Sequence, residues 1–226
     1  MNILSEIGIQ QWRLRQPRVT ESLNEGEDDA VIDSGLGASA NELKDWQGLE
    51  TWLQEEHCQS CKQGGYLLGE GDRMADYLFL VDAPSCEALN QQMITNGRAR
   101  RLYEAMLNAI SLDINKVYTA SVFKCAPSEQ VSVSTACQDL LSLEVMLVEP
   151  KVIVCLGEFS AQTLLKSNEP LASLREQTHK FPSTDIDVVP SESLIELLQT
   201  PKLKAHAWQD LKRARAAALN TERKQP

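Results

Sequence analysis

The sequence predicts a three-layer α/β/α fold around a central, mainly parallel sheet of four strands. Short apolar runs alternate with helical patterns over most of the chain. Strands that alternate with helices imply right-handed crossovers and a parallel sheet that is covered on both faces. The length of 226 residues suits one such domain with an additional tail.

Each element follows from a local pattern. The expected strands are 76–81, 117–122, 152–156 and 186–189, and the expected helices are 98–111, 134–148, 158–165 and 204–219. Before the first strand, Asn41 is placed to cap a helix that continues to Leu53. Ligands bind beyond the carboxyl ends of the strands in sheets of this kind. The segments expected to carry a site are therefore 82–87, 119–128, 157–160 and 190–194.

The first 40 residues differ from this domain, which is expected to span 41–226. Residues 1–17 predict a short amphipathic helix, because Ile7, Ile9, Trp12 and Leu14 lie mainly on one side. Residues 18–40 lack periodicity and include six acidic residues between positions 21 and 33, which predicts a flexible acidic linker. A tethered amphipathic helix is typical of peptides that dock into a partner's groove, with Trp12 as the anchor. The alternative is a helix that folds back on its own domain.

The formal net charge of -10 argues against a broad nucleic-acid-binding face, so direct DNA binding is not expected. Residues 202–224 nevertheless hold seven basic residues, and this last helix either contacts phosphate or, more simply, presents a solvated face. No apolar run is long enough for a membrane span and no signal peptide is recognisable. These features predict a cytoplasmic protein whose cysteines are reduced.

Four of the six cysteines are expected to bind a metal. Cys58 and Cys61 form a Cys-x-x-Cys pair that can chelate one ion from a tight turn. Cys125 follows the second strand, and Cys137 lies near the start of a helix. Four thiolates suit zinc and a [4Fe-4S] cluster equally well by ligand count.

In their order along the chain, these cysteines and five motifs resemble the family-four, iron-sulfur uracil-DNA glycosylases. The family has Gly-Glu-Ala-Pro-Gly, Thr-Asn-x-x-Lys-Cys-x-Pro-Pro, Pro-Lys-x-Ile-x-x-Leu-Gly, His-Pro-Ser/Ala and Trp-x-Asp-Leu. This chain has Val-Asp-Ala-Pro-Ser at 81–85, Thr-Ala-Ser-Val-Phe-Lys-Cys-Ala-Pro at 119–127, Pro-Lys-Val-Ile-Val-Cys-Leu-Gly at 150–157, Val-Pro-Ser at 189–191 and Trp-Gln-Asp-Leu at 208–211. The resemblance implies a uracil-DNA glycosylase-like fold. It also favours a [4Fe-4S] cluster over zinc.

The same resemblance implies that the active site is degenerate. In the family an acid in the first turn serves hydrolysis, an Asn reads the flipped uracil, a Phe stacks on it and a His stabilises the oxyanion. Here Asp82 shortens the acid, Ala120 and Val189 are assigned to the Asn and His positions, and residues 93–97 contain no aromatic ring. A base must be extruded, stacked and hydrogen-bonded before its bond can break. We therefore predict no catalytic residue and no uracil excision, with Asp82 more simply a cap or turn residue.

Residues 4–17 resemble the N-terminal segment of the psi subunit of bacterial DNA polymerase III, through a Gly-Ile-x-Gln-Trp-x-Leu-Arg-x-Pro pattern. That resemblance implies docking on the gamma/tau collar of the clamp loader, with Arg15 joining the four apolar residues of the helix. The domain would then bind chi, and through chi the single-stranded-DNA-binding protein.

The leading hypothesis is thus a non-catalytic, psi-like accessory subunit of the clamp loader. The alternative is a divergent iron-sulfur uracil-DNA glycosylase or a DNA-binding repair protein.

Overall fold

The structure is a computed structural model that describes residues 45–54, 66–126 and 135–222. The predicted docking helix, the acidic linker and Asn41 lie outside these residues, as do Cys58 and Cys61. The expected domain boundaries therefore stay predictions. None of the helices in the described ranges has the length and hydropathy that a membrane span requires.

The described sheet has six strands in the order β1-β3-β2-β4-β6-β5. Its centre consists of four parallel strands, β3 (Tyr118–Ser121), β2 (Tyr77–Val81), β4 (Val152–Leu156) and β6 (Asp187–Ser191). A two-residue antiparallel strand closes each edge, β1 (Glu70–Gly71) beside β3 and β5 (His179–Lys180) beside β6. The expected four-stranded parallel sheet is confirmed as the centre of this larger mixed sheet. The two edge strands are too short to produce a sequence pattern.

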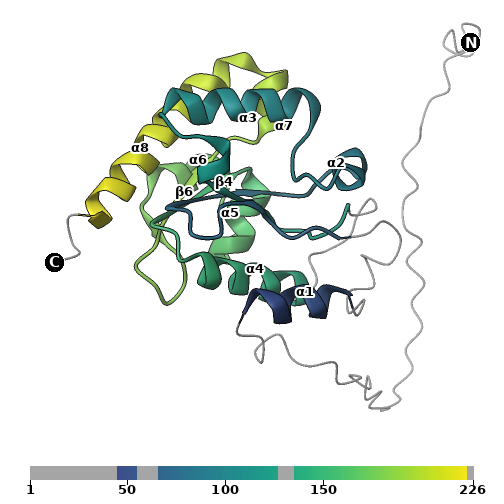
Figure 1. Cartoon of the computed structure of the whole chain (residues 1–226). Helices are drawn as coiled ribbons and strands as arrows, with labels where there is room; N and C mark the ends of the chain where they lie inside the picture. The colour runs from purple at the N-terminus through teal and green to yellow at the C-terminus, as the bar shows by residue number, and fades with distance from the viewer. Residues whose placement is uncertain (1–44, 55–65, 127–134, 223–226) are drawn as a thin grey trace, which may run out of the picture. The chain divides into compact units, whose positions relative to one another are not determined.

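Helices cover both faces of the sheet (Figure 1). One face packs against α3 (Gly97–Ala109), α7 (Leu194–Gln199) and α8 (Lys204–Glu222). The other packs against α4 (Thr135–Val148), α5 (Glu158–Leu165) and α6 (Leu171–Glu176). The remaining short helices are α2 (Cys86–Asn90), η4 (Ile114–Lys116) and η5 (Pro201–Leu203).

Successive side chains along each strand point alternately to these two faces, because the side chains of a β-strand repeat every two residues. In β2, Phe79 and Val81 pack with the α3 side, and Leu78 and Leu80 pack with the α4 side. All five residues of β2 and all five of β4 are buried, so the two strands read as continuous apolar runs. This is why they were recognisable from the sequence.

The helix α1 (Trp46–Gln54) is preceded by Asp45, whose Oδ1 accepts a hydrogen bond from the Gly48 N–H at 2.7 Å. The predicted cap, Asn41, lies outside the described residues. Leu49, Trp52 and Leu53 are buried against Leu140 of α4. The chain that leaves α1 towards Cys58 therefore starts from the surface of α4.

Candidate functional site

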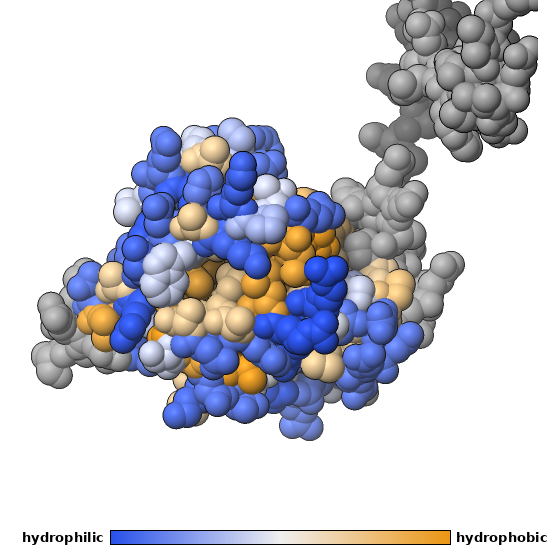
Figure 2. Space-filling model, turned by 90° about the horizontal axis from the view of Figure 1, so that it is seen from above, coloured by the Kyte–Doolittle hydropathy of each residue, from blue (hydrophilic) through white to orange (hydrophobic). Residues whose placement is uncertain are grey.

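A pocket of about 260 Å³ lies at the carboxyl ends of the parallel strands. It opens between the first turn of α3 and the first turn of α7. Its lining residues are Val81, Asp82, Ala83, Ser85, Ile94, Thr95, Asn96, Ala99, Leu156, Ser193, Leu194 and Ile195. From the side of α3 and α7, hydrophobic residues gather in the hollowed middle of this face and hydrophilic residues surround them (Figure 2). The segments 82–87 and 190–194 were expected here from the strand order, and residues 93–97 from the family resemblance as the counterpart of the segment with the stacking Phe.

Val81 and Leu156, the last residues of β2 and β4, line the pocket and belong to a row formed by the last residues of the four parallel strands. Val81 is in register with Ser121 on one side and Leu156 on the other, and Leu156 is in register with Ser191. Residues paired in this way point to the same face of a sheet. Since Val81 and Leu156 line the pocket, the two serines also face its side of the sheet.

Three buried hydroxyl groups around this row have no hydrogen-bond partner within the described residues, those of Thr95, Ser121 and Ser191. A buried hydroxyl without a partner costs about 1–3 kcal/mol, and native proteins rarely keep several of them together. Thr95 lines the pocket and can offer a hydrogen bond to a ligand with a polar edge, whereas Ser121 and Ser191 are fully buried on the same side of the sheet and do not line it. The surrounding Val81, Ile94, Leu156 and Leu194 offer apolar contact.

Asp82 follows β2 directly, and its carboxylate caps α5 from outside that helix. The N-cap residue of α5 is Gly157, which has no side chain, and the Asp82 Oδ1 accepts a hydrogen bond from the Ser160 N–H at 2.8 Å. Gly157 has a φ of 146°, and a Cβ there would lie 2.6 Å from Oδ1. Glycine is therefore required beside this carboxylate. The simpler interpretation of Asp82, a helix cap, agrees with this contact.

Removing the cap is expected to destabilise the fold. We expect Asp82→Ala to lower the free energy of unfolding by about 1 kcal/mol and the melting temperature by roughly 2–4 °C. Asp82→Asn keeps an oxygen acceptor for the Ser160 N–H and serves as the matched control, with a smaller loss. Thermal unfolding of the three proteins measures the difference. Equal melting temperatures for Ala and wild type would show that the cap contributes nothing.

The pocket also perturbs the acidity of Asp82. Burial raises the pKa of its carboxyl group, and the hydrogen bonds from Ser160 only partly oppose that rise. A carboxyl whose pKa is higher in the folded state binds protons better there, so its contribution to stability is greatest at low pH. That contribution is lost as the pH rises from the ordinary pKa through the raised one.

The residues assigned from the sequence to the Asn and His positions do not line the pocket. Ala120 is fully buried on the opposite face of the sheet, and Val189 packs in the core on the α7 side. Counted back from Lys124, the spacing of Thr-Asn-x-x-Lys-Cys puts Ser121 at the Asn position. The structure agrees with this count, because alternation turns Ser121 towards the pocket. The assignment of Ala120 was therefore wrong by one residue, and the spacing was the signal that could have corrected it.

An aromatic pair adjoins Asp82 and was not expected from the sequence. The Phe123 and Phe159 rings are stacked with centroids 5.4 Å apart, and the Phe123 N–H donates to the Asp82 carbonyl oxygen at 3.0 Å. Phe159, in the first turn of α5, is partly exposed. Neither ring lines the pocket itself.

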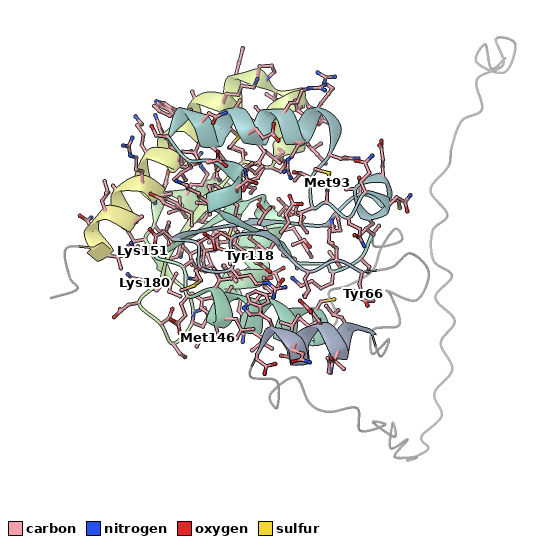
Figure 3. The ribbon with its side chains drawn as sticks, in the orientation of Figure 1. Tyr66, Met93, Tyr118, Met146, Lys151 and Lys180 are labelled. Atoms are coloured by element: carbon pink, nitrogen blue, oxygen red, sulfur yellow. The ribbon has the colours of Figure 1, made fainter. Side chains whose placement is uncertain are left out.

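A buried ion pair holds the segment that leads to Cys125. The ammonium group of Lys124 contacts the carboxylate of Glu144 in α4, and both side chains are fully buried. Glu144 Oε1 also accepts hydrogen bonds from the Tyr118 hydroxyl at 3.0 Å and the Gly69 N–H at 2.8 Å. Figure 3 shows Tyr118 in the sheet, above α4. Burial and the adjacent Glu144 raise the pKa of Tyr118, which keeps its hydroxyl protonated as a donor.

The two described cysteines of the predicted metal site lie close to the elements that flank residues 55–65. Cys125 and Cys137 are both buried. The Leu67 N–H donates to the Lys124 carbonyl oxygen at 2.7 Å, so Leu67 lies beside the residue that precedes Cys125. The chain before Cys58 leaves α1, which packs on α4, the helix that carries Cys137. Among the described residues no group of three metal-ligating side chains is found, and the other two predicted ligands, Cys58 and Cys61, lie outside these residues.

The chain is similar to proteins of one known family. Residues 68–212 match the model of the uracil DNA glycosylase superfamily. The Type-4 uracil-DNA glycosylase of Sulfurisphaera tokodaii is 26% identical over 181 residues, which cover 74% of this chain and 82% of the relative. That of Archaeoglobus fulgidus is 31% identical over 113 residues, 46% of this chain and 57% of the relative. That of Saccharolobus solfataricus is 24% identical over 175 residues, 71% of this chain and 81% of the relative.

These comparisons contradict the leading hypothesis from the sequence. The matched region contains the pocket, and the relatives are named as glycosylases, so the interpretation as a psi-like clamp-loader subunit is wrong. It rested on residues 4–17, which lie outside the described residues, and a resemblance over so short a segment does not outweigh a match over most of the domain. The expected fold class is confirmed.

Proposed function

Because this chain belongs to the uracil DNA glycosylase superfamily, we propose that it is a divergent DNA-repair member that binds DNA by accepting a base into the pocket. The observation that carries this proposal is the pocket at the carboxyl ends of the strands, which joins apolar side chains to the Thr95 hydroxyl. That hydroxyl is buried and has no hydrogen-bond partner in the described residues. A flipped base has the matching chemistry, with apolar faces and a hydrogen-bonding edge.

We further propose that uracil excision by this chain is slow or absent. Cleavage of the glycosidic bond needs donors aimed at the charge that develops in the transition state. Val189 supplies none, and one oxygen of Asp82 is engaged in capping α5. Since one lost donor of this kind costs about 10²–10³ in rate, we expect excision at least ~10³-fold slower than that of the Type-4 relatives.

The four cysteines Cys58, Cys61, Cys125 and Cys137 would hold a [4Fe-4S] cluster, with zinc as the alternative. Bound there, the group would supply a covalent connection between residues 55–65 and the β3–α4 segment. Lys124 and Glu144 hold the Cys125 side of this connection in place. The role proposed for the cluster is therefore structural support of the pocket's neighbouring strand.

Fluorescence anisotropy with single-stranded oligonucleotides tests the proposal. We expect a uracil- or thymine-containing strand to bind at least about tenfold more tightly than a strand with an abasic analogue at the central position, since stacking and burial of one base contribute about 1–3 kcal/mol. The same reactions, followed for released uracil, test the low excision rate. Excision at the rate of a Type-4 relative, abolished in Asp82→Asn, would contradict it.

Filling the pocket provides a matched pair of variants. Ala99 lines the pocket and Ala105 is exposed on the same helix α3. We expect Ala99→Phe to weaken binding of the base-containing strand to the level of the abasic strand, and Ala105→Phe to leave both affinities unchanged. Equal binding by the two variants would mean that DNA does not enter this pocket.

A further inference from the structure

The three sides of helix α8 have different surroundings. One side is buried against the sheet and carries Ala207, Leu211, Ala214 and Ala218. A second side contacts Glu192 and α6 and carries His206, Asp210 and Arg213. Residues at steps of three or four share one side of a helix, and the third side therefore carries Lys204, Trp208, Lys212, Arg215 and Leu219. We call these five exposed residues the outer row of α8.

The outer row combines positive charge with an aromatic ring. Within the described residues, the ion pairs of α8 all lie on its second side. Lys204, Lys212 and Arg215 therefore keep their positive charges at the surface without a neighbouring carboxylate. The Trp208 side chain lies between these cations and is 43% exposed, and the Lys212 ammonium nitrogen is 5.7 Å from the centroid of its ring.

The segment Trp-Gln-Asp-Leu at 208–211 divides its side chains between the core and the surface. Asp210 is buried, and its Oδ2 accepts a hydrogen bond from the Arg175 Nε at 2.9 Å. Leu211 packs in the core, whereas Trp208 belongs to the outer row. The negative charge of the segment is thus removed from the surface, and the aromatic ring remains on it beside the basic side chains. Such a surface suits a ligand with flat rings and negative charge.

The start of α8 lies beside the loop that forms one wall of the pocket. The Nδ1 atom of His206 is 3.2 Å from Oε1 of Glu192, and Glu192 precedes Ser193, which lines the pocket. Figure 1 shows α8 continuing from there along the outside of the domain. At about 1.5 Å per residue, the outer row extends roughly 22 Å from Lys204 to Leu219, a length that can follow several nucleotides of a strand.

We propose that the outer row of α8 binds single-stranded nucleic acid that continues outward from the pocket. Its three cations contact phosphates, and the Trp208 ring stacks on a base that stays outside the pocket. The proposal rests on the proposed function for the identity of the ligand. Backbone cations combined with an aromatic ring are the means by which proteins bind single strands without sequence preference. The row also gives a chain with a net charge of -10 a local positive surface that attracts the strand.

The ring favours a single strand over a duplex and over an acidic polypeptide. The bases of a duplex are stacked on one another, so their faces are not accessible to a side chain on the outside, whereas a single strand exposes them. An acidic polypeptide would match the three cations equally well, but carboxylates offer no face on which the Trp208 ring can stack. The two ligands therefore differ in how they depend on Trp208.

Neutral replacements of the cations test the phosphate contacts, with the full chain and fluorescein-labelled single strands in anisotropy titrations. Each of Lys212→Gln and Arg215→Gln is expected to weaken binding about fivefold for both the base-containing and the abasic strand, and to reduce the slope of log affinity against log salt by about 0.7. The matched control is Lys116→Gln, an equal charge change at an exposed lysine of η4, which should stay within a factor of about two of wild type. Outer-row variants that bind both strands as wild type does would overturn the proposal.

Two replacements of Trp208 separate stacking from simple apolar contact. Trp208→Phe keeps an aromatic face and should bind both strands within about threefold of wild type, whereas Trp208→Leu keeps an apolar side chain without that face and should bind about tenfold more weakly. Melting temperatures measured on the same two proteins check that both are folded. Equal strand affinities for the Phe and Leu variants would show that the ring does not stack on a base.

Competition and the pocket variant distinguish the remaining outcomes. Poly-glutamate should displace the labelled strand far less effectively than an unlabelled strand of equal charge, and equal displacement would assign the outer row to an acidic polypeptide and overturn the proposal. If the outer-row variants weaken binding while Ala99→Phe does not, the proposed function fails and the outer row remains a strand-binding surface. If Ala99→Phe alone weakens binding, the outer-row proposal fails and the proposed function stands.

Discussion

Replacement of Cys125 or Cys137 by serine is expected to abolish metal binding and to lower the melting temperature by roughly 10 °C, because a structural metal contributes several kcal/mol to folding and each kcal/mol shifts a domain of this size by about 2–4 °C. Both thiols are buried next to the anchors of residues 55–65. Serine preserves their size but cannot replace a thiolate ligand.

Cys155 provides the control for this experiment. It is a buried thiol in β4, outside the predicted ligand set, and burial raises the pKa of its thiol, so it is not a ready ligand. Cys155→Ala should keep the full metal content. Iron, sulfide and zinc analysis with visible absorbance measures the outcome. Wild-type protein without iron or zinc, or a Cys125→Ser variant with full metal, would contradict the assignment, and zinc without iron would replace the cluster by a zinc site.

Breaking the buried ion pair between Lys124 and Glu144 is expected to be similarly severe. Lys124→Met leaves the Glu144 carboxylate buried without its counter-ion, which costs about 3–5 kcal/mol, or roughly 10 °C in melting temperature. Urea or thermal unfolding measures the loss. Lys180→Gln, which removes a surface ion pair with Asp187, is the control and should cost about 1 kcal/mol or less.

A second substitution shows that the uncompensated charge, and not lost packing, causes the effect. Glu144→Gln removes that charge while its amide oxygen still accepts hydrogen bonds from Tyr118 and Gly69. The double variant Lys124→Met/Glu144→Gln should therefore be more stable than Lys124→Met alone. If the two proteins are equally unstable, the ion pair is not what holds this segment.

The sequence was sufficient for the parts of the fold whose residues follow a pattern over several positions. The runs 152–156 and 158–165 were expected at the bounds that β4 and α5 have, because apolar runs and helical periodicity extend over their whole length. The strands β1 and β5 have two residues each and produce no period. The six-residue helices α6 and α7 have fewer than two turns, so they were missed.

The candidate site was predicted less completely, because it depends on which residues meet in space. Asp82 was identified from its motif, but that it caps α5 depends on Gly157, 75 positions later. A single threonine has no sequence pattern that marks it as a site residue. Thr95 could be assigned to the pocket only from its burial and from the absence of a hydrogen-bond partner for its hydroxyl in the described residues. The assignment of Ala120 failed because a shift of one residue in a strand exchanges the two faces of the sheet.

The short antiparallel strands at both edges of the sheet limit how this protein can meet other molecules. β1 and β5 cover the outer sides of β3 and β6 over only two residues each, and such short edges give an incoming peptide little backbone to pair with. Association by strand addition, and the edge-to-edge aggregation that uses the same hydrogen bonds, is therefore disfavoured within the described domain. Recognition is left to side chains on the helices and to the loops at the strand ends.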